Sequence, residues 1–166
     1  LYSDPAAILD FVNTTFVDVT LDEDFATMLL VRYEPKNMQL QYASAGHETG
    51  WLLGKNGQLR ELKATGVMVG IDSEMTWESV PMQLQPGDRL FAYTDGLPEM
   101  SDGQGECLGR SAMPELFIRS NNEDVGSMTE AIRKAAYDHR GNAIQQDDLT
   151  FFVAEFSQRA TTRGEA

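Results

Sequence analysis

The chain has 166 residues, 42% of them hydrophobic, and its 13 basic against 26 acidic residues give a formal net charge of −13. This length and apolar content are typical of a folded globular domain. The acidic balance argues against general nucleic-acid binding, and no apolar run approaches the roughly 20 residues of a membrane helix. A single cysteine, Cys107, excludes a disulfide framework, and no secretory leader is visible at Leu1, so we expect a cytoplasmic protein.

The first half of the chain predicts one helix followed by two hairpins. Asp4-Pro5 has the pattern of an N-cap and a first helical residue, and apolar residues at helical spacing continue to near Val17. An acidic loop comes next. The strand segments that follow are 25–35 with 37–46, and then 50–64, which has Asn56-Gly57 at its turn.

The second half predicts two more strands, two helices and a closing strand. In chain order these are two strands within 76–96 around Pro86-Gly87, helices from Ser111 to Arg119 and from Val125 to His139, and a strand within 148–156. The polar segment 158–166 lacks apolar periodicity and is interpreted as a loose tail. Because helices do not alternate with strands, we expect a single antiparallel α+β domain over residues 1–157 rather than a doubly wound parallel sheet.

Three aspartates at strand boundaries are the main candidates for chemistry. Asp95 follows one predicted strand, and Asp147-Asp148 precede the closing strand. If those strands are neighbours, the carboxylates converge at one end of a sheet, where hard oxygen ligands suit Mg²⁺ or Mn²⁺. Waters between such metals and a phosphate become nucleophiles at neutral pH. Spacing alone favours a plainer interpretation, in which Asp95 serves a turn and the Asp pair caps a loop.

Five sequence blocks add to this pattern by their order and gaps: FATML, YASAGH, GVMVGI, PGDRLFAYTDGLPE and QDDLTFF. On these blocks the chain, from Asp4 to about Phe156, resembles the metal-dependent protein phosphatases of type 2C. The resemblance is to the bacterial branch that includes the stage II sporulation phosphatase and regulators of sigma factors. It implies an antiparallel β-sandwich flanked by helices, with two Mn²⁺ or Mg²⁺ ions and a bridging water that attacks phosphoserine or phosphothreonine.

The same resemblance implies roles for individual residues. Asp95 and Asp147 match the family's metal ligands, and no catalytic group is implied beyond the metal-activated water. Gly96 and Asp148 are expected to support the site from outside the ligand set. Thr27 is interpreted mainly as a strand residue that could support the site through its hydroxyl, and Gly70, in a block that lies near the family's site, as a place of close backbone packing. The implied substrate is a phosphorylated anti-anti-sigma factor, and a sensor or receiver domain is expected upstream in the full protein.

The sequence departs from the family in one respect, because the two opening aspartate blocks of the family do not occur in it. Only part of a two-metal centre is therefore expected, and the starting Leu1 favours a missing front over one that has been lost. Such a piece would expose sheet edges, and we expect it to pair with the missing segment or with another chain, or to aggregate. The alternatives left open are an inactive pseudophosphatase that binds its partner as a regulatory module, and a calcium-binding domain.

Other nucleophile chemistries lack their motifs. Ser44 in ASAGH lacks the first glycine of a nucleophile elbow. His47 could act as a general base, but a strand-end histidine that hydrogen-bonds locally is the favoured interpretation because no nucleophile motif accompanies it. Cys107 is interpreted as a residue packed in a loop.

Overall fold

The computed structural model describes residues 3–21, 24–121 and 124–157, so the predicted tail at 158–166 lies outside the described residues. The chain divides into two compact units. Unit 1 comprises Leu1–His47, Lys63–Asp88 and Phe156–Ala166, and unit 2 comprises Glu48–Leu62 and Arg89–Glu155. That residues 1–157 form one domain stays a prediction. No helix within the described ranges has the length and hydropathy needed to span a membrane.

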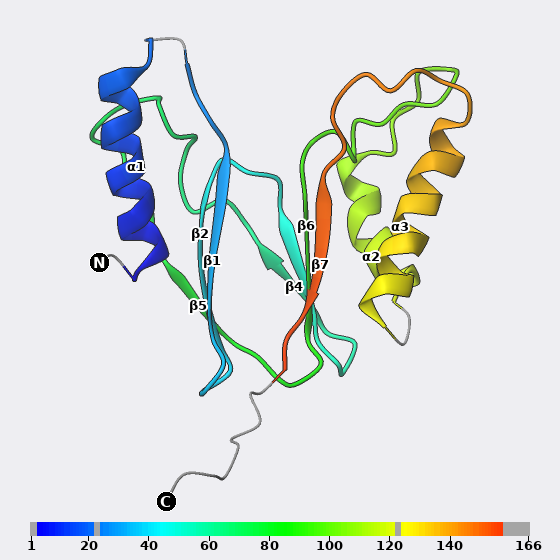
Figure 1. The fold of residues 1–166 in the computed structure, drawn as a ribbon, viewed down its shortest axis with the longest axis horizontal. Coiled ribbons are helices and arrows are strands. Elements are labelled where there is room, and N and C mark those ends of the chain that lie inside the picture. Colours follow the sequence, from blue (N-terminus) through cyan, green and yellow to red (C-terminus); the bar gives the residue numbers. More distant parts are fainter. Residues whose placement is uncertain (1–2, 22–23, 122–123, 158–166) are drawn as a thin grey trace, which may run out of the picture. The chain divides into compact units, whose positions relative to one another are not determined.

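Unit 1 combines one helix with a three-stranded antiparallel sheet (Figure 1). Its elements are α1 (Pro5–Val19), β1 (Met28–Glu34), β2 (Gln39–Ala45) and β5 (Val80–Gln83), and the strand order is β1-β2-β5. The start of α1 is the predicted one, because the Asp4 carboxylate accepts a hydrogen bond from the Ala7 amide at 3.3 Å and Pro5 takes the first helical position.

The core of unit 1 lies between α1 and its sheet. Leu9 of α1 is fully buried, and so are Ala43 and Ala45 of β2, whose short side chains let the helix approach the strand closely. Two isolated bridges, Ala26 with Val69 and Ala45 with Gly66, attach the segment 66–70 to this sheet.

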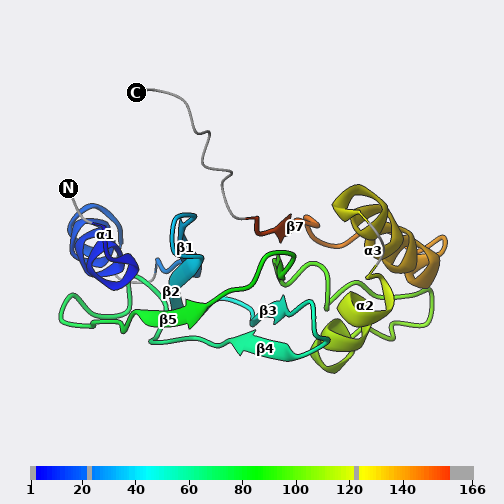
Figure 2. The same cartoon turned by 90° about the horizontal axis from the view of Figure 1, so that it is seen from below.

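Unit 2 combines a four-stranded antiparallel sheet with two helices that lie beside one another in both views (Figures 1 and 2). Its strands, in the order β4-β3-β6-β7, are β4 (Leu59–Leu62), β3 (Gly50–Leu53), β6 (Arg89–Tyr93) and β7 (Phe151–Glu155). Its helices are α2 (Met113–Arg119), preceded by the 3₁₀ turn η1 (Arg110–Ala112), and α3 (Val125–Arg140).

Aromatic residues fill the core of unit 2. The Phe91 ring stacks on Phe117 of α2 at 5.1 Å between centroids and also contacts Tyr93 and Phe151. At the opposite end of β6 from the candidate site, Arg89 pairs with Glu155 of β7 at 2.8 Å. Strand β6 is therefore fixed by the packing of Phe91 in the core and by the ion pair of Arg89 at its start.

The predicted element order, with one helix, six strands, two helices and a closing strand, is confirmed. Both predicted hairpins are antiparallel pairs, β1 with β2 and β3 with β4. The two strands around Pro86-Gly87 belong to different sheets, because β5 pairs with β2 and β6 pairs with β3. The closing strand begins at Phe151 rather than at 148, because Thr150 is bonded to a side chain of the neighbouring turn.

Candidate functional site

Strands β6 and β7 bring the two predicted aspartate turns to the same end of the sheet of unit 2. The strands pair antiparallel from Arg89 with Glu155 to Tyr93 with Phe151. Beyond that last pair, the Thr94 amide donates to the Thr150 carbonyl at 2.9 Å, and the Thr150 amide donates to Thr94 Oγ1 at 3.2 Å. Asp95 leaves β6 where Asp147-Asp148 enter β7, which is the neighbour relation that the sequence argument required.

The turn after β6 rests directly against the backbone of the second turn. Gly96 is buried, and a Cβ atom there would overlap the Asp148 carbonyl oxygen. Leu97 and Met100 anchor the same turn in the aromatic core. Turn hydrogen bonds complete it, with the Glu99 amide donating to the Asp95 carbonyl at 2.9 Å. Only glycine fits this close approach, and a role of Gly96 in the metal site stays a prediction.

The carboxylates themselves are presented to solvent. Asp95, Asp147 and Asp148 are all exposed, and one Asp147 carboxylate oxygen accepts a hydrogen bond from the Asp148 amide at 2.7 Å. Exposed hard oxygens on two fixed turns suit Mg²⁺ or Mn²⁺, which bind through one or two carboxylates and keep several waters. Within residues 3–21, 24–121 and 124–157, no three Asp, Glu, His or Cys side chains are grouped closely enough to hold an ion together. The described donors thus fit part of a metal centre.

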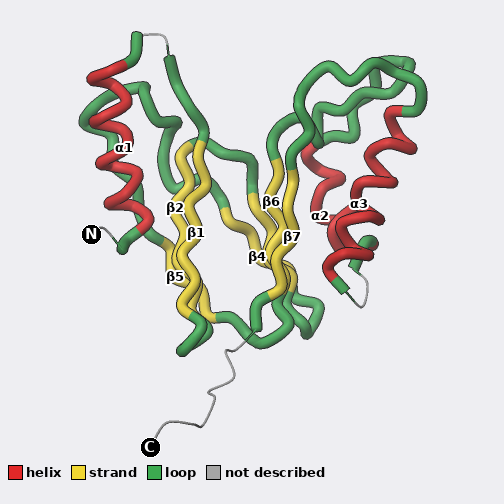
Figure 3. Tube along the Cα trace, viewed as in Figure 1, coloured by secondary structure: helices red, strands yellow, loops and turns green. Residues whose placement is uncertain are grey.

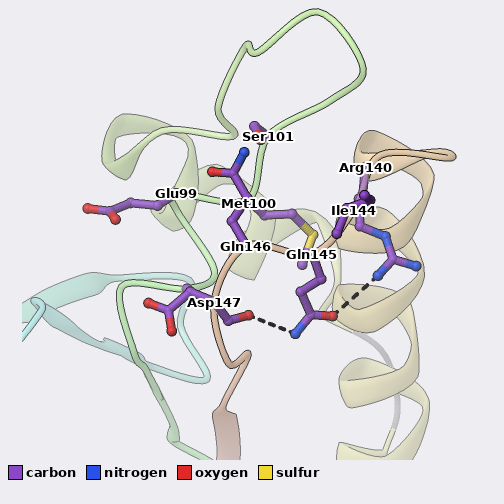
Figure 4. A pocket seen from close by; sticks show the side chains of 9 residues that line it. Glu99, Met100, Ser101, Arg140, Ile144, Gln145, Gln146 and Asp147 are labelled. Atoms are coloured by element: carbon purple, nitrogen blue, oxygen red, sulfur yellow. Dashed lines mark hydrogen bonds between the residues drawn. The ribbon is translucent and has the colours of Figure 1, made fainter.

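A small pocket adjoins these carboxylates within unit 2 (Figure 4). It has a volume of about 50 Å³ and lies between the turn after β6 and the connection from α3 to β7, two loops that run side by side at one end of the unit (Figure 3). From the first loop it is lined by Gly96, Glu99 and Met100, and from the second by Arg140, Gln145 and Asp147. Gly141, with φ of 56°, ends α3 and turns the chain toward this pocket.

Sequence reasoning did not identify Arg140 or Gln145 as site residues. Arg140 Nη1 donates to Gln145 Oε1 at 3.2 Å, and Gln145 Nε2 donates to the Asp147 carbonyl at 2.8 Å, so the two residues form a chain that ends at a predicted ligand. The one signal in the sequence was their position shortly before Asp147. No motif marks them.

Arg110 holds the carboxylate of Glu99 at the rim of the pocket. Its Nη2 atom lies 2.6 Å from Glu48 Oε1 and 2.9 Å from Glu99 Oε1. The hydrogen bond to Glu48, followed by the one to Glu99, holds the pKa of the Arg110 guanidinium well above its ordinary value. The charge of Glu99 is therefore compensated by a residue outside the pocket. Among the residues that line the pocket, the positive charge comes from Arg140.

The other two predicted supporting residues, Thr27 and Gly70, belong to unit 1. Thr27 is exposed and follows Ala26, which bridges to Val69 directly before Gly70, so the two lie near one another. Gly70 has φ of 99°, and a Cβ there would stand 2.5 Å from the Asp24 carbonyl oxygen. These contacts require glycine at position 70 for backbone reasons, and a role of either residue in the metal site stays a prediction.

Comparison with known proteins identifies relatives along most of the chain. The profile of the family "Stage II sporulation protein E (SpoIIE)" matches residues 1–157. Protein IcfG of Synechocystis sp. is 29% identical over 87% of this chain and 22% of its own length. Phosphoserine phosphatase RsbU of Bacillus subtilis is 30% identical over 81% of this chain and 39% of its own length. The chain thus spans well under half of either curated relative.

Solved structures share the fold. The SiaA-PP2C domain of Pseudomonas aeruginosa superposes with a TM-score of 0.82 and 22% identity, over 93% of this chain and 61% of that one. RsbX, solved in complex with magnesium, gives a TM-score of 0.59 and 16% identity, over 91% of this chain and 64% of that one. The predicted antiparallel α+β fold of the type 2C phosphatases is confirmed.

Proposed function

The chain belongs to the stage II sporulation protein E family, and from this membership we propose that it is a metal-dependent protein serine/threonine phosphatase domain. Its substrate would be a phosphoserine or phosphothreonine on a regulatory protein. The relative that is named a phosphoserine phosphatase supports the reaction class.

One observation carries this proposal, and it is the joining of the two aspartate turns. Reciprocal hydrogen bonds between Thr94 and Thr150 and the contact of Gly96 with the Asp148 carbonyl hold Asp95 and Asp147 at one sheet end. A plain turn and a plain loop cap would each be satisfied locally, without this mutual attachment. Two carboxylates held by rigid strands are what a preorganised ligand pair requires.

The residues divide the chemistry as follows. Asp95 and Asp147 would bind Mn²⁺ or Mg²⁺, and a bound ion of this kind supplies a nucleophilic water at neutral pH. Asp148 and Gly96 hold the two turns in register. In the overall reaction water adds to phosphorus, the bond from phosphorus to the serine or threonine oxygen breaks, and inorganic phosphate and the free hydroxyl result.

The wider setting is part of the same proposal. A phosphorylated anti-anti-sigma factor is the proposed substrate protein, an upstream sensor or receiver domain is proposed to control it, and the proposed location is the bacterial cytoplasm. These proposals are supported by the family membership and by the similarity to RsbU. They rest on relatedness and not on a contact with a substrate.

The test is Mn²⁺-dependent hydrolysis of an aryl phosphate and of a phosphoserine peptide by the full-length protein. Asp95→Asn and Asp147→Asn keep the side-chain shape and remove the charge, and each should lower kcat/KM by more than about 100-fold, since even outer partners of metal ligands are worth about 10–100-fold. The matched control is Asp138→Asn, an exposed carboxylate of α3 that bonds Lys134. Equal activity in all three variants would refute the proposed ligands.

A pseudophosphatase module is the second candidate function, and one observation favours it. The described residues provide no group of three metal-binding side chains. This alternative expects a phosphoprotein to bind without turnover at any Mn²⁺ or Mg²⁺ concentration, whereas the phosphatase releases inorganic phosphate.

A further inference from the structure

Among the residues that the structure describes, Arg140 has no acidic partner, although the chain is strongly acidic. The chain carries 26 acidic against 13 basic residues, and the other arginines of unit 2 that flank the core or the site are paired: Arg89 with Glu155, Arg110 with Glu48, and Arg133 with Glu130. Arg140 bonds to the neutral amide of Gln145, and no described carboxylate pairs with it. Its charge is therefore available to a ligand of the pocket that it lines.

The guanidinium of Arg140 is held in place before any ligand arrives. It stacks over the Tyr137 ring at 4.8 Å. Gln145, five residues further along the chain, accepts a hydrogen bond from it (Figure 4). The Nε atom of Arg140 is buried and lacks a hydrogen-bond partner among the described residues. A buried donor without a partner costs free energy, so the position of this guanidinium is not explained by hydrogen bonding within the described residues alone.

The other walls of the pocket are suited to an acidic amino-acid side chain. Met100, which is buried, and Ile144, which is 87% exposed, offer apolar surface to a short aliphatic stem. The lining also holds two carboxylates, that of Glu99, which is paired with Arg110, and that of the proposed metal ligand Asp147. The volume of about 50 Å³ is room for a few water molecules and hence for a carboxylate, not for a large ring. A single planar fork of donors matches a carboxylate better than a phosphoryl group, which is usually bound by several charges and backbone amides.

We infer that this pocket binds the carboxylate of a glutamate or aspartate that flanks the phosphorylated residue of the substrate protein. The guanidinium of Arg140 donates to the carboxylate, while Met100 and Ile144 contact its stem. The inference rests on the proposed function, because it assigns a substrate subsite next to Asp147. Placing an acidic residue of the peptide here positions its phosphorylated neighbour toward the carboxylates of Asp95 and Asp147.

Arg140 could also occupy this position only because it stabilises the helix. An arginine in the last turn of a helix interacts favourably with the helix dipole, and stacking on tyrosine adds to stability. Arg133 serves as the matched control, because it lies on the same helix and over the same Tyr137 ring at 5.3 Å but is paired with Glu130.

The experiment compares phosphoserine peptides in which one glutamate is placed at successive positions on either side of the phosphoserine, each matched by a glutamine version. For the full-length protein we expect kcat/KM to favour glutamate over glutamine by roughly 10-fold at one position, the size of a charged hydrogen bond in a half-open site. The preference should shrink as ionic strength rises. An equal rate for every glutamate and glutamine pair overturns the inference without any variant.

Substitutions then assign the preference to Arg140. Arg140→Gln should abolish the preference for glutamate over glutamine, Arg140→Lys should keep part of it, and Arg133→Gln should keep all of it. If Arg140→Gln instead lowers the rates of aryl phosphate and of every peptide equally, Arg140 acts on the phosphoryl group or on the fold, and the inference is wrong.

A binding measurement separates this inference from the proposed function. Fluorescence anisotropy with the same labelled peptides, in the absence of divalent metal, reports the glutamate preference whether or not turnover occurs. Binding that favours glutamate through Arg140 with no hydrolysis would refute the phosphatase proposal and keep the subsite. Hydrolysis with no glutamate preference would refute the subsite and keep the phosphatase.

Discussion

The two units of the chain fix their candidate site residues by different physical means. In unit 2 the turn that carries Asp95 continues into the apolar core through Leu97 and Met100. In unit 1 the loop that begins at Gly70, directly after the buried Val69, is held by polar contacts, chiefly from one buried asparagine of α1. Packing resists displacement in every direction, whereas a hydrogen bond resists it only while its partner stays in place.

The asparagine in question is Asn13, which is fully buried on α1. Its side-chain oxygen accepts from the Gly70 amide at 2.9 Å, and its side-chain nitrogen donates to the Asp72 carbonyl at 2.8 Å. One side chain thus satisfies two backbone groups of the loop. A single substitution can therefore release the loop of unit 1, whereas releasing the turn of unit 2 requires damage to its core.

The largest expected effect comes from the aromatic core of unit 2. Phe91→Ala should lower the free energy of unfolding by about 3–5 kcal/mol, because a fully buried ring is lost and a cavity remains. Phe152→Ala, at a ring of β7 that is 48% exposed, is the control and should cost much less. Urea unfolding measures both. Similar losses in the two variants would show that packing on Phe91 does not anchor the site strand.

Asn13→Ala tests the polar fixation of unit 1. The amide of Gly70 and the carbonyl of Asp72 would each be left unpaired at about 1–3 kcal/mol, and we expect a total loss of about 2–4 kcal/mol. Thr14→Ala on the exposed face of the same helix should change stability little. Hydrogen exchange at the Gly70 amide should rise sharply in the first variant alone. Unchanged exchange would contradict the role given to Asn13.

Gly96→Ala tests the close contact between the two aspartate turns. The added methyl would overlap the Asp148 carbonyl, which we expect to cost about 1–3 kcal/mol in stability and, by displacing the carboxylates, about 100-fold in kcat. Gly103→Ala, at a loop glycine with no atom near its missing Cβ, is the control. Normal kcat in the first variant would mean that the turns need not touch for the reaction.

The smallest effect concerns the acid stability of α3 in unit 2. Hydrogen bonds from the Ser127 hydroxyl and amide to the Asp124 carboxylate hold the pKa of Asp124 below its ordinary value. A lowered folded-state pKa stabilises the protein above the ordinary pKa, and this stabilisation is lost as the pH falls through the folded-state value, below about pH 4.

Asp124→Asn keeps a capping oxygen but cannot titrate. Its unfolding free energy should therefore fall less steeply with acid than that of the wild type below about pH 4. Denaturant unfolding at a series of pH values measures the slope. The same slope in both proteins would show that Asp124 contributes nothing to acid sensitivity.

Local patterns in the sequence predicted most of the elements, because their causes are local. The Asp4-Pro5 cap and the spacing of apolar residues on α1 placed that helix, and hairpin turns placed two strand pairs. The separation of β5 from β6 into different sheets could not be predicted. These strands are adjacent in sequence, but β5 pairs with β2 and β6 pairs with β3. Long-range pairing depends on the whole core rather than on a sequence window.

The candidate site was predictable in part for the same reason. Asp95 and Asp147 lie beside strands that the apolar pattern of the sequence predicts, and both belong to motif blocks of the family. Arg140 and Gln145 had no such signal, because their importance arises from the turn of the chain at Gly141, which brings the end of α3 over the pocket. Residues that depend on tertiary contacts alone are the ones that sequence reasoning missed.

The central claim is that Asp95 and Asp147 bind one metal ion together, and a Mn²⁺ titration followed by electron paramagnetic resonance tests it most directly. We predict that Asp95→Asn and Asp147→Asn each weaken Mn²⁺ affinity by more than about 10-fold, and that the double variant is weakened by less than the product of the two effects. Wild-type affinity in either single variant, or fully multiplicative losses in the double variant, would contradict a shared ion.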